Sequence, residues 1–207
     1  MLASVFIKAE QPESKRLMVV LHGLGDSEAG YRWLPSALKL PWMNYHLVNA
    51  PDSYFGGYSW YDFSGDAATG ICRSRALLFE FLDDLEAKGF PTVQTTMFGF
   101  SQGCLMTWEM GFRYSKRFAG LVGVSGYAHE PDVAILELSP VAKEQRFLIT
   151  HGTVDPLIPF ADVREQVNVI KSEGLNVEWH EFVKAHTIQG EEELDIIRDF
   201  VIAGYDT

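Results

Sequence analysis

Residues 93–103 read VQTTMFGFSQG, and this stretch decides the fold. Its first part, residues 93–98, is an apolar and β-branched run typical of a buried strand, whereas residues 102–113 have the apolar spacing of a helix. Between them, GFSQG matches G-x-S-x-G, the pattern in which a serine occupies a strained strand-to-helix turn. The five-residue pattern is common by itself. The strand before it and the helix after it predict that Ser101 is a nucleophile.

Strands and helices alternate along the rest of the chain, which predicts an α/β fold with a mostly parallel central sheet and helices on both faces. Further strands are expected at residues 5–7, 17–21, 45–50, 118–124, 147–150 and 177–183. Further helices are expected at residues 28–38, 71–85, 162–171 and 191–202. Residues 52–69 show neither period and are expected to form a long surface loop rich in aromatic side chains. No linker or repeat interrupts this order, so residues 1–207 are expected to form a single domain.

The composition argues against several classes of partner. A formal net charge of -11 disfavours nucleic acid and stable docking on an anionic membrane surface. The N-terminal residues lack the pattern of a signal peptide and no apolar run is long enough to cross a bilayer, so a cytoplasmic location is expected. Cys72 and Cys104 are expected to be reduced and mostly buried, although Cys104 lies in the first turn of a helix, where a thiol can become acidic. The sequence carries no indication of oligomeric state.

A serine nucleophile needs a base that removes its proton and an acid that orients the base. Where the serine follows a strand in this way, the acid and then the histidine come later in the chain, each beyond the end of a strand. His186 lies between the last strand and the last helix and is the predicted base. Asp155 follows the strand at residues 147–150 and is the predicted acid, with Asp162 as the alternative. His151 directly ends that strand and is expected to shape the acid loop. The other histidines lie too early or inside a strand: His22, His46, His129 and His180.

Acyl transfer also needs two backbone N–H groups directed at the oxygen that becomes negatively charged. One is expected from Gln102, the residue after the nucleophile. The other is expected from residues 21–26, LHGLGD, a glycine-rich loop after an early strand. Such a loop can also bind phosphate, but the chain contains no G-x-x-x-x-G-K-[ST] motif. No HExxH or comparable ligand set predicts a metal, and the expected chemistry requires no metal or organic cofactor.

Four segments together resemble the phospholipase/carboxylesterase family of α/β-hydrolases, which includes acyl-protein thioesterases. They are residues 21–26 (LHGLGD), 59–62 (SWYD), 99–103 (GFSQG) and 151–155 (HGTVD). The resemblance covers nearly the whole chain and implies an α/β-hydrolase fold. It implies a catalytic triad of Ser101, Asp155 and His186. It further implies that the backbone N–H groups of Leu24 and Gln102 form the oxyanion hole, and that Trp60 helps to wall the acyl site.

The acyl site is expected to lie among aromatic side chains. Tyr61 and the rest of the aromatic stretch at residues 54–63, together with Leu157 and Ile158, are predicted to form an apolar pocket; packing of this loop onto the domain is the alternative. Two features depart from the family pattern. Ala185 stands before the predicted catalytic histidine, where the family usually has glycine. The segments from Pro51 to Trp60 and after Asp62 look shorter than in acyl-protein thioesterases, which favours a shorter or more open pocket.

The sequence therefore predicts a serine carboxylesterase that hydrolyses small carboxylic esters, and thioesters as a second class, through an acyl-enzyme on Ser101. The expected partner is a small-molecule ester or acyl substrate. A lysophospholipase or an acyl-protein thioesterase is the alternative within the same family. An alternative of another class is a hydrolase fold that serves as a ligand receptor with slow turnover.

Overall fold

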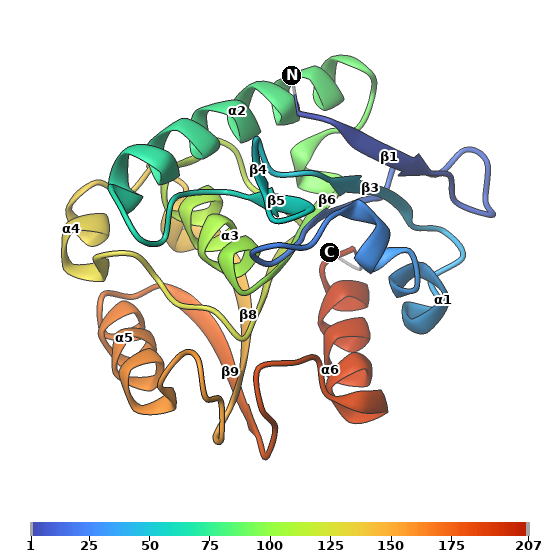
Figure 1. The fold of residues 1–207 in the computed structure, drawn as a ribbon. Helices are drawn as coiled ribbons and strands as arrows, with labels where there is room; N and C mark the ends of the chain where they lie inside the picture. The colour runs from blue at the N-terminus through green and yellow to red at the C-terminus, as the bar shows by residue number, and fades with distance from the viewer. Residues whose placement is uncertain (1, 206–207) are drawn as a thin grey trace.

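The computed structural model describes residues 2–205, and its centre is a seven-stranded sheet (Figure 1). The strand order is β1-β3-β2-β6-β7-β8-β9. Only β1 (Ser4–Ile7) runs antiparallel, at the edge beside β3 (Asn44–Val48). β3 is parallel to the remaining strands, which are β2 (Leu17–Leu21), β6 (Thr95–Phe100), β7 (Gly120–Val124), β8 (Arg146–Gly152) and β9 (Asn176–Phe182). The mostly parallel sheet is confirmed, and the loops after its parallel strands gather at one edge.

Helices cover both faces of this sheet and enclose two separate cores. One face carries α2 (Ala67–Ala87), α3 (Gln102–Arg113), α4 (Pro131–Leu136) and α5 (Phe160–Ser172). The other carries α1 (Leu34–Leu38) and α6 (Gly190–Ala203). In Figure 1, α4 and α5 lie to the left of the sheet, and α1 and α6 lie to the right. Short 3-10 segments lie at Thr92–Gln94 and Ala142–Glu144. No helix among residues 2–205 combines the length and apolarity that crossing a bilayer would require.

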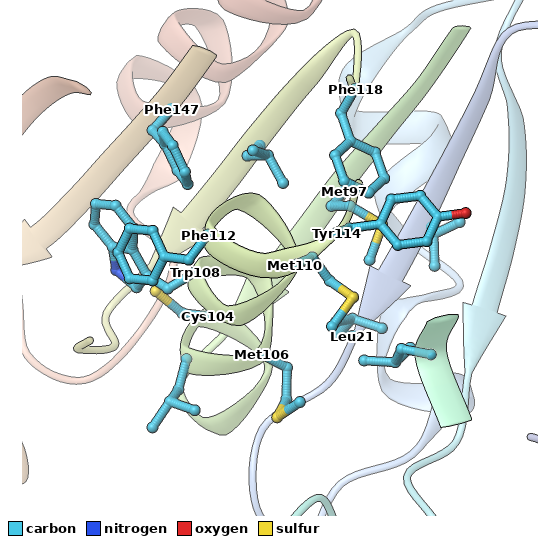
Figure 2. Close-up of a cluster of buried hydrophobic side chains, with 14 of the residues drawn as sticks. Leu21, Met97, Cys104, Met106, Trp108, Met110, Phe112, Tyr114, Phe118 and Phe147 are labelled. Carbon is cyan, nitrogen blue, oxygen red and sulfur yellow. The ribbon is translucent and has the colours of Figure 1, made fainter. Parts of the chain in front are cut away.

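The helix α3 is buried along almost its whole length, because it lies between the sheet and α2. The Trp108 ring stacks on Phe112 with centroids 5.2 Å apart, and on Phe147 of β8 with centroids 4.7 Å apart (Figure 2). Such close packing leaves little freedom for the helix to shift. Its N-terminus, where the predicted nucleophile lies, is therefore held rigidly against the sheet.

The helix expected at residues 28–38 is interrupted, so that prediction is wrong in detail. The structure has a 3-10 turn at Glu28–Tyr31 followed by the short helix α1. Pro35 lies in the first turn of α1. Proline is accepted there but breaks a hydrogen bond in a helix interior, so a continuous helix across residues 28–38 is disfavoured.

The expectation of a structureless loop at residues 52–69 is also wrong. The segment contains a hairpin of β4 (Asp52–Tyr54) and β5 (Gly57–Ser59), and α2 already begins at Ala67. Phe55 and Gly56 form the two-residue turn with φ of 43° and 91°. Positive φ at both positions suits the twist of a tight hairpin. Strands of three residues are too short to show a period in the sequence.

The two cysteines are free, and they differ in environment, so the expected burial is confirmed for Cys104 and wrong for Cys72. Cys72 is exposed, whereas Cys104 is buried. Burial raises the pKa of the Cys104 thiol to about 12, with the Gly126 backbone and Lys184 opposing the shift. Because only the thiolate reacts readily with oxidants, Cys104 is protected despite its place at the start of a helix.

His46 of β3 contributes a pH-dependent part of the stability. Burial, followed by the nearby Lys88, lowers the pKa of His46 from 6.5 to about 4. Between these values the unfolded chain binds a proton more readily than the folded chain, so acid favours unfolding. We expect protonation of this residue to reduce the free energy of unfolding by about 2 kcal/mol as the pH falls through this range. The stability advantage of the parent over His46→Gln should therefore shrink toward acid in urea titrations; a difference independent of pH would contradict this.

Candidate active site

The turn between β6 and α3 holds Ser101 in an unusual backbone conformation, with φ 54° and ψ -115°. Its N–H donates to the Val124 carbonyl of β7 at 3.0 Å. Both flanking glycines are required by close approach of the backbone. A Cβ on Gly99 would lie 2.0 Å from the Gly103 oxygen, and one on Gly103 would lie 2.1 Å from the Leu21 oxygen. The surrounding backbone thus holds Ser101 in this strained conformation at the end of β6.

The structure brings His186 to this serine from the loop between β9 and α6. Its Nε2 lies 2.9 Å from the Ser101 Oγ. Its Nδ1 lies 2.8 Å from Oδ2 of Asp155, which comes from the loop after β8. The imidazole also packs against the Phe100 ring, with centroids 5.0 Å apart. Three side chains separated widely in the sequence thus form one continuous chain of hydrogen bonds.

Asp155 is oriented by its own loop. Its Oδ1 accepts hydrogen bonds from the N–H groups of Leu157 at 2.9 Å and Ile158 at 3.0 Å, while the side chain is fully buried. Burial alone would raise the pKa of Asp155, but the hydrogen bonds from Ile158, His186 and Leu157 outweigh it and hold the pKa below its usual value. The carboxylate is therefore ionised and can only accept. Nδ1 of His186 must carry the proton, which leaves Nε2 free to accept one from Ser101.

Other titratable side chains near the site have different tasks. His151 is buried, and its Nε2 donates to the Ile158 carbonyl at 3.0 Å, so it holds the acid loop. Burial lowers the pKa of His151 and keeps its ring neutral. Asp162 lies in the first turn of α5. Within residues 2–205, no three His, Cys, Asp or Glu side chains come together in the arrangement of a metal site.

A cavity of about 440 Å³ opens beside Ser101. The predicted residues Tyr61, Leu157 and Ile158 line it. So do Phe63, which lies in the aromatic stretch, and Tyr127, which no pattern in the sequence indicated. Leu157 and Phe63 are 70% and 75% exposed. The cavity wall is therefore largely apolar, and the cavity is open to solvent where Phe63 and Leu157 lie.

Trp60 does not lie in the wall of this cavity, which corrects the role expected for it. Its side chain is completely buried, and the indole Nε1 donates to the His22 carbonyl at 2.9 Å. Its backbone N–H donates to Oε1 of Gln102 at 2.9 Å. Trp60 therefore fastens the loop after the hairpin to the two segments that flank Ser101.

Gln102 and Leu24 both line the cavity that contains Ser101. The Gln102 N–H belongs to the first turn of α3, where no partner exists within the helix. The Leu24 N–H has no hydrogen-bond partner within the described residues. The Gln102 side chain points to the loop after the hairpin, where its Oε1 accepts from Trp60 and its Nε2 donates to the Tyr61 carbonyl at 3.0 Å. Two residues that line the cavity beside Ser101 thus have backbone N–H groups without a partner among the described residues, and an oxyanion hole needs donors of this kind.

Known proteins match this chain over most of its length. The family model described as Phospholipase/Carboxylesterase matches residues 2–203. The chain belongs to this family. An acyl-protein thioesterase 1 of Schizosaccharomyces pombe is 33% identical over 159 residues, which cover 69% of this chain and 69% of that protein. The crystal structure of esterase PE8 is 26% identical with a TM-score of 0.87, covering 97% of this chain and 98% of the other. The Bacillus cereus carboxylesterase, 18% identical with a TM-score of 0.84 over 99% and 95% of the two chains, supports the fold.

This member of the phospholipase/carboxylesterase family has the predicted α/β-hydrolase fold and is a hydrolase of the esterase and thioesterase kind.

Its alanine before His186 is accommodated without strain. Ala185 is exposed and is not among the residues with positive φ. Because neither positive φ nor burial requires glycine at this position, the departure leaves the histidine loop intact.

Proposed function

We propose that this protein is a serine carboxylesterase that hydrolyses small carboxylic esters through an acyl-enzyme on Ser101. The observation that carries the proposal is the hydrogen-bond chain from the Ser101 Oγ through His186 to the ionised Asp155. A serine hydroxyl needs a base of this kind before it can attack a carbonyl carbon. The orientation of the imidazole, with Nε2 free, suits that role.

The mechanism assigns one task to each group. As the Ser101 Oγ bonds to the carbonyl carbon, Nε2 of His186 takes its proton, and Asp155 stabilises the imidazolium. The N–H groups of Leu24 and Gln102 stabilise the negative oxygen of the tetrahedral intermediate. His186 then gives the proton to the leaving oxygen or sulfur, and the acyl–serine ester remains. Water, deprotonated by His186, attacks this ester and releases the acid and the free serine.

The apolar cavity beside Ser101 supports an acyl group of modest length. Its volume of about 440 Å³ lies toward the small end of ligand pockets. Tyr61 is held at one side by a hydrogen bond between its hydroxyl and that of Tyr127, 3.2 Å apart. We assign the acyl chain to this cavity and expect Phe63 and Leu157 to contact its far end.

A second candidate is an acyl-protein thioesterase, and two observations favour it. The relative from Schizosaccharomyces pombe carries that name. The exposed side chains of Phe63 and Leu157 leave the cavity open at one side, so a longer chain could continue along them. The same triad would serve, because a thiolate leaves more readily than an alkoxide and needs no further group.

A series of p-nitrophenyl esters with increasing acyl length distinguishes the two candidates. Each methylene buried in the cavity contributes about 0.8 kcal/mol, so kcat/KM should rise about fourfold per methylene until the cavity is filled. We expect a maximum at butyrate or hexanoate and a decline by laurate. Butyryl and palmitoyl thioesters of one small thiol should show the same order.

Other outcomes of this series would replace the proposal. A maximum at palmitate, in esters and thioesters alike, would favour the acyl-protein thioesterase. Fatty-acid release from lysophospholipids above that from simple esters would favour a lysophospholipase. Turnover too slow to measure, with saturable ligand binding in the same cavity, would favour a receptor.

A further inference from the structure

We infer that His22 is a positioning residue that fixes the direction of the Leu24 N–H in the oxyanion hole. The inference rests on the proposed function, because the Leu24 N–H has this task only if Ser101 attacks a carbonyl. His22 itself does not touch the substrate. It lies at the end of β2, is 1% exposed, and holds the peptide that follows it.

The partners of the imidazole define its tautomer. The Ala50 N–H donates to Nε2 at 3.0 Å, so Nε2 carries a lone pair. Nδ1 must then carry the proton of the neutral ring, and it donates to the Gly23 carbonyl at 2.6 Å. If both ring nitrogens carried a proton, the N–H at Nε2 would face the Ala50 N–H, and neither of these two donors could accept from the other. Burial lowers the pKa of His22 and outweighs the Gly23 carbonyl, Asp26 and Glu28, which favour the charged form.

The bond to Gly23 acts on the oxyanion hole through one peptide unit. The Gly23 carbonyl and the Leu24 N–H belong to the same planar group, in which the two bonds point in opposite directions in the trans form. No cis peptide is present among the described residues. Holding the carbonyl toward His22 therefore directs the N–H away from it. The accepted hydrogen bond also polarises the amide and strengthens its N–H as a donor.

Gly23 cannot fix this peptide with a side chain of its own. A Cβ on Gly23 would lie 3.0 Å from the Phe100 ring and 3.3 Å from the Ser101 Cβ, so the segment runs directly beside the nucleophile. The Asp26 N–H reaches the same carbonyl only at 3.3 Å. The shorter bond from His22 is therefore the stronger restraint on the peptide.

His22 is also connected to Gln102, the residue that carries the second N–H of the proposed oxyanion hole. Its carbonyl accepts from the Trp60 indole at 2.9 Å, and the Trp60 backbone N–H donates to the Gln102 side chain. The segments that carry the two N–H donors, around Leu24 and Gln102, are thus joined through one buried tryptophan. Their separation is determined by this bridge as well as by the sheet.

Two substitutions test the two hydrogen bonds of the His22 imidazole separately. An asparagine amide ends near the position of Nδ1 and can donate to the Gly23 carbonyl, whereas a glutamine amide ends near Nε2 and can accept from Ala50. We expect His22→Gln to lower kcat for p-nitrophenyl butyrate by about 10²-fold with KM nearly unchanged, and His22→Asn to stay within about fivefold of the parent. Binding of a trifluoromethyl ketone, which mimics the tetrahedral intermediate, should weaken in proportion to kcat/KM. His180→Gln, a histidine on the edge strand, is the matched control and should leave both constants unchanged.

The outcomes separate the inference from the proposed function. Equal losses in the asparagine and glutamine variants, or a loss that appears in KM, would overturn the positioning role while the esterase stands. An inert parent would overturn the proposed function and this role with it. The tautomer can be measured in Ser101→Ala, without turnover, from the imidazole ¹⁵N shifts. A neutral His22 protonated at Nδ1 is expected, and a proton at Nε2 would contradict the inference.

Discussion

Ser101→Ala is expected to lower kcat/KM for p-nitrophenyl butyrate by at least about 10⁴-fold. The substitution removes the atom that we propose forms the acyl-enzyme, while the two proposed backbone donors remain and allow a small residual rate. The backbone is not disturbed, because alanine and serine experience the same strain at φ 54°. Initial rates measured by absorbance, together with thermal unfolding of both proteins, test the prediction. Activity at the level of the parent would exclude Ser101 as the nucleophile.

Two further variants support the interpretation of that loss. Ser125 is also buried, follows strand β7 and has φ 50°, but its hydroxyl points to the Thr187 carbonyl at 3.4 Å. Ser125→Ala should therefore reduce activity less than about tenfold, since this long bond is weak. Ser101→Gly should be as inactive as Ser101→Ala but more stable by about 1 kcal/mol, because glycine relieves the positive φ.

Lys184→Met is expected to lower the free energy of unfolding by about 3 kcal/mol. Lys184 and Glu193 are both fully buried, with Nζ 2.5 Å from Oε1. Burial lowers the pKa of Lys184, against the attraction of Glu193 that favours its charged form. Removal of the ammonium leaves the Glu193 carboxylate buried without its counter-charge. Urea unfolding of the parent and the variant measures the loss.

The same pair organises the histidine loop. Glu193 also accepts hydrogen bonds from the Thr150 hydroxyl and the Gln189 N–H, and the Lys184 carbonyl accepts from Val154 in the acid loop. Lys184→Met should therefore reduce kcat as well as stability. His186 follows two residues after the lysine, and its distance from Ser101 depends on that loop.

A double variant distinguishes loss of charge balance from loss of packing. Lys184→Met with Glu193→Gln keeps the acceptor for Thr150 and Gln189 but removes both charges, so it should recover to within about 1 kcal/mol of the parent. Arg73→Met breaks the exposed pair with Asp52, whose side chains are 50% and 44% exposed, and should cost less than about 0.5 kcal/mol. If the single and the double variant lost the same free energy of unfolding, the loss would come from packing and not from the unpaired charge.

Local sequence signals were sufficient for the strand before the glycine-rich loop and for the helix after Ser101. The strand at residues 17–21 and the helix at residues 102–113 have the same bounds in the structure. Both are strongly apolar segments with clear turn residues beside them, so their local preference and their tertiary environment agree. The order of serine, acid and histidine then selected Ser101, Asp155 and His186, because the loops after parallel strands meet at one edge of the sheet.

Only the tertiary structure could show which contacts fix the loops that follow the parallel strands. The hairpin at Asp52–Ser59 forms where its strands are too short for a period, and Tyr58 pairs with Gly25 and Asp26 of the oxyanion loop. Trp60 was expected in the acyl wall and is buried behind it, since its indole finds a partner in the His22 carbonyl.

The sequence by itself thus determined the fold class and which side chains meet, because these follow from periodicity and chain order. The tertiary structure decided which groups hold them. The neutral tautomer of His22, the bridge through Trp60 and the buried pair of Lys184 and Glu193 depend on partners 9 to 42 residues apart. A buried polar group gains its role from the one partner that packing places beside it, and no local pattern in a sequence specifies that partner.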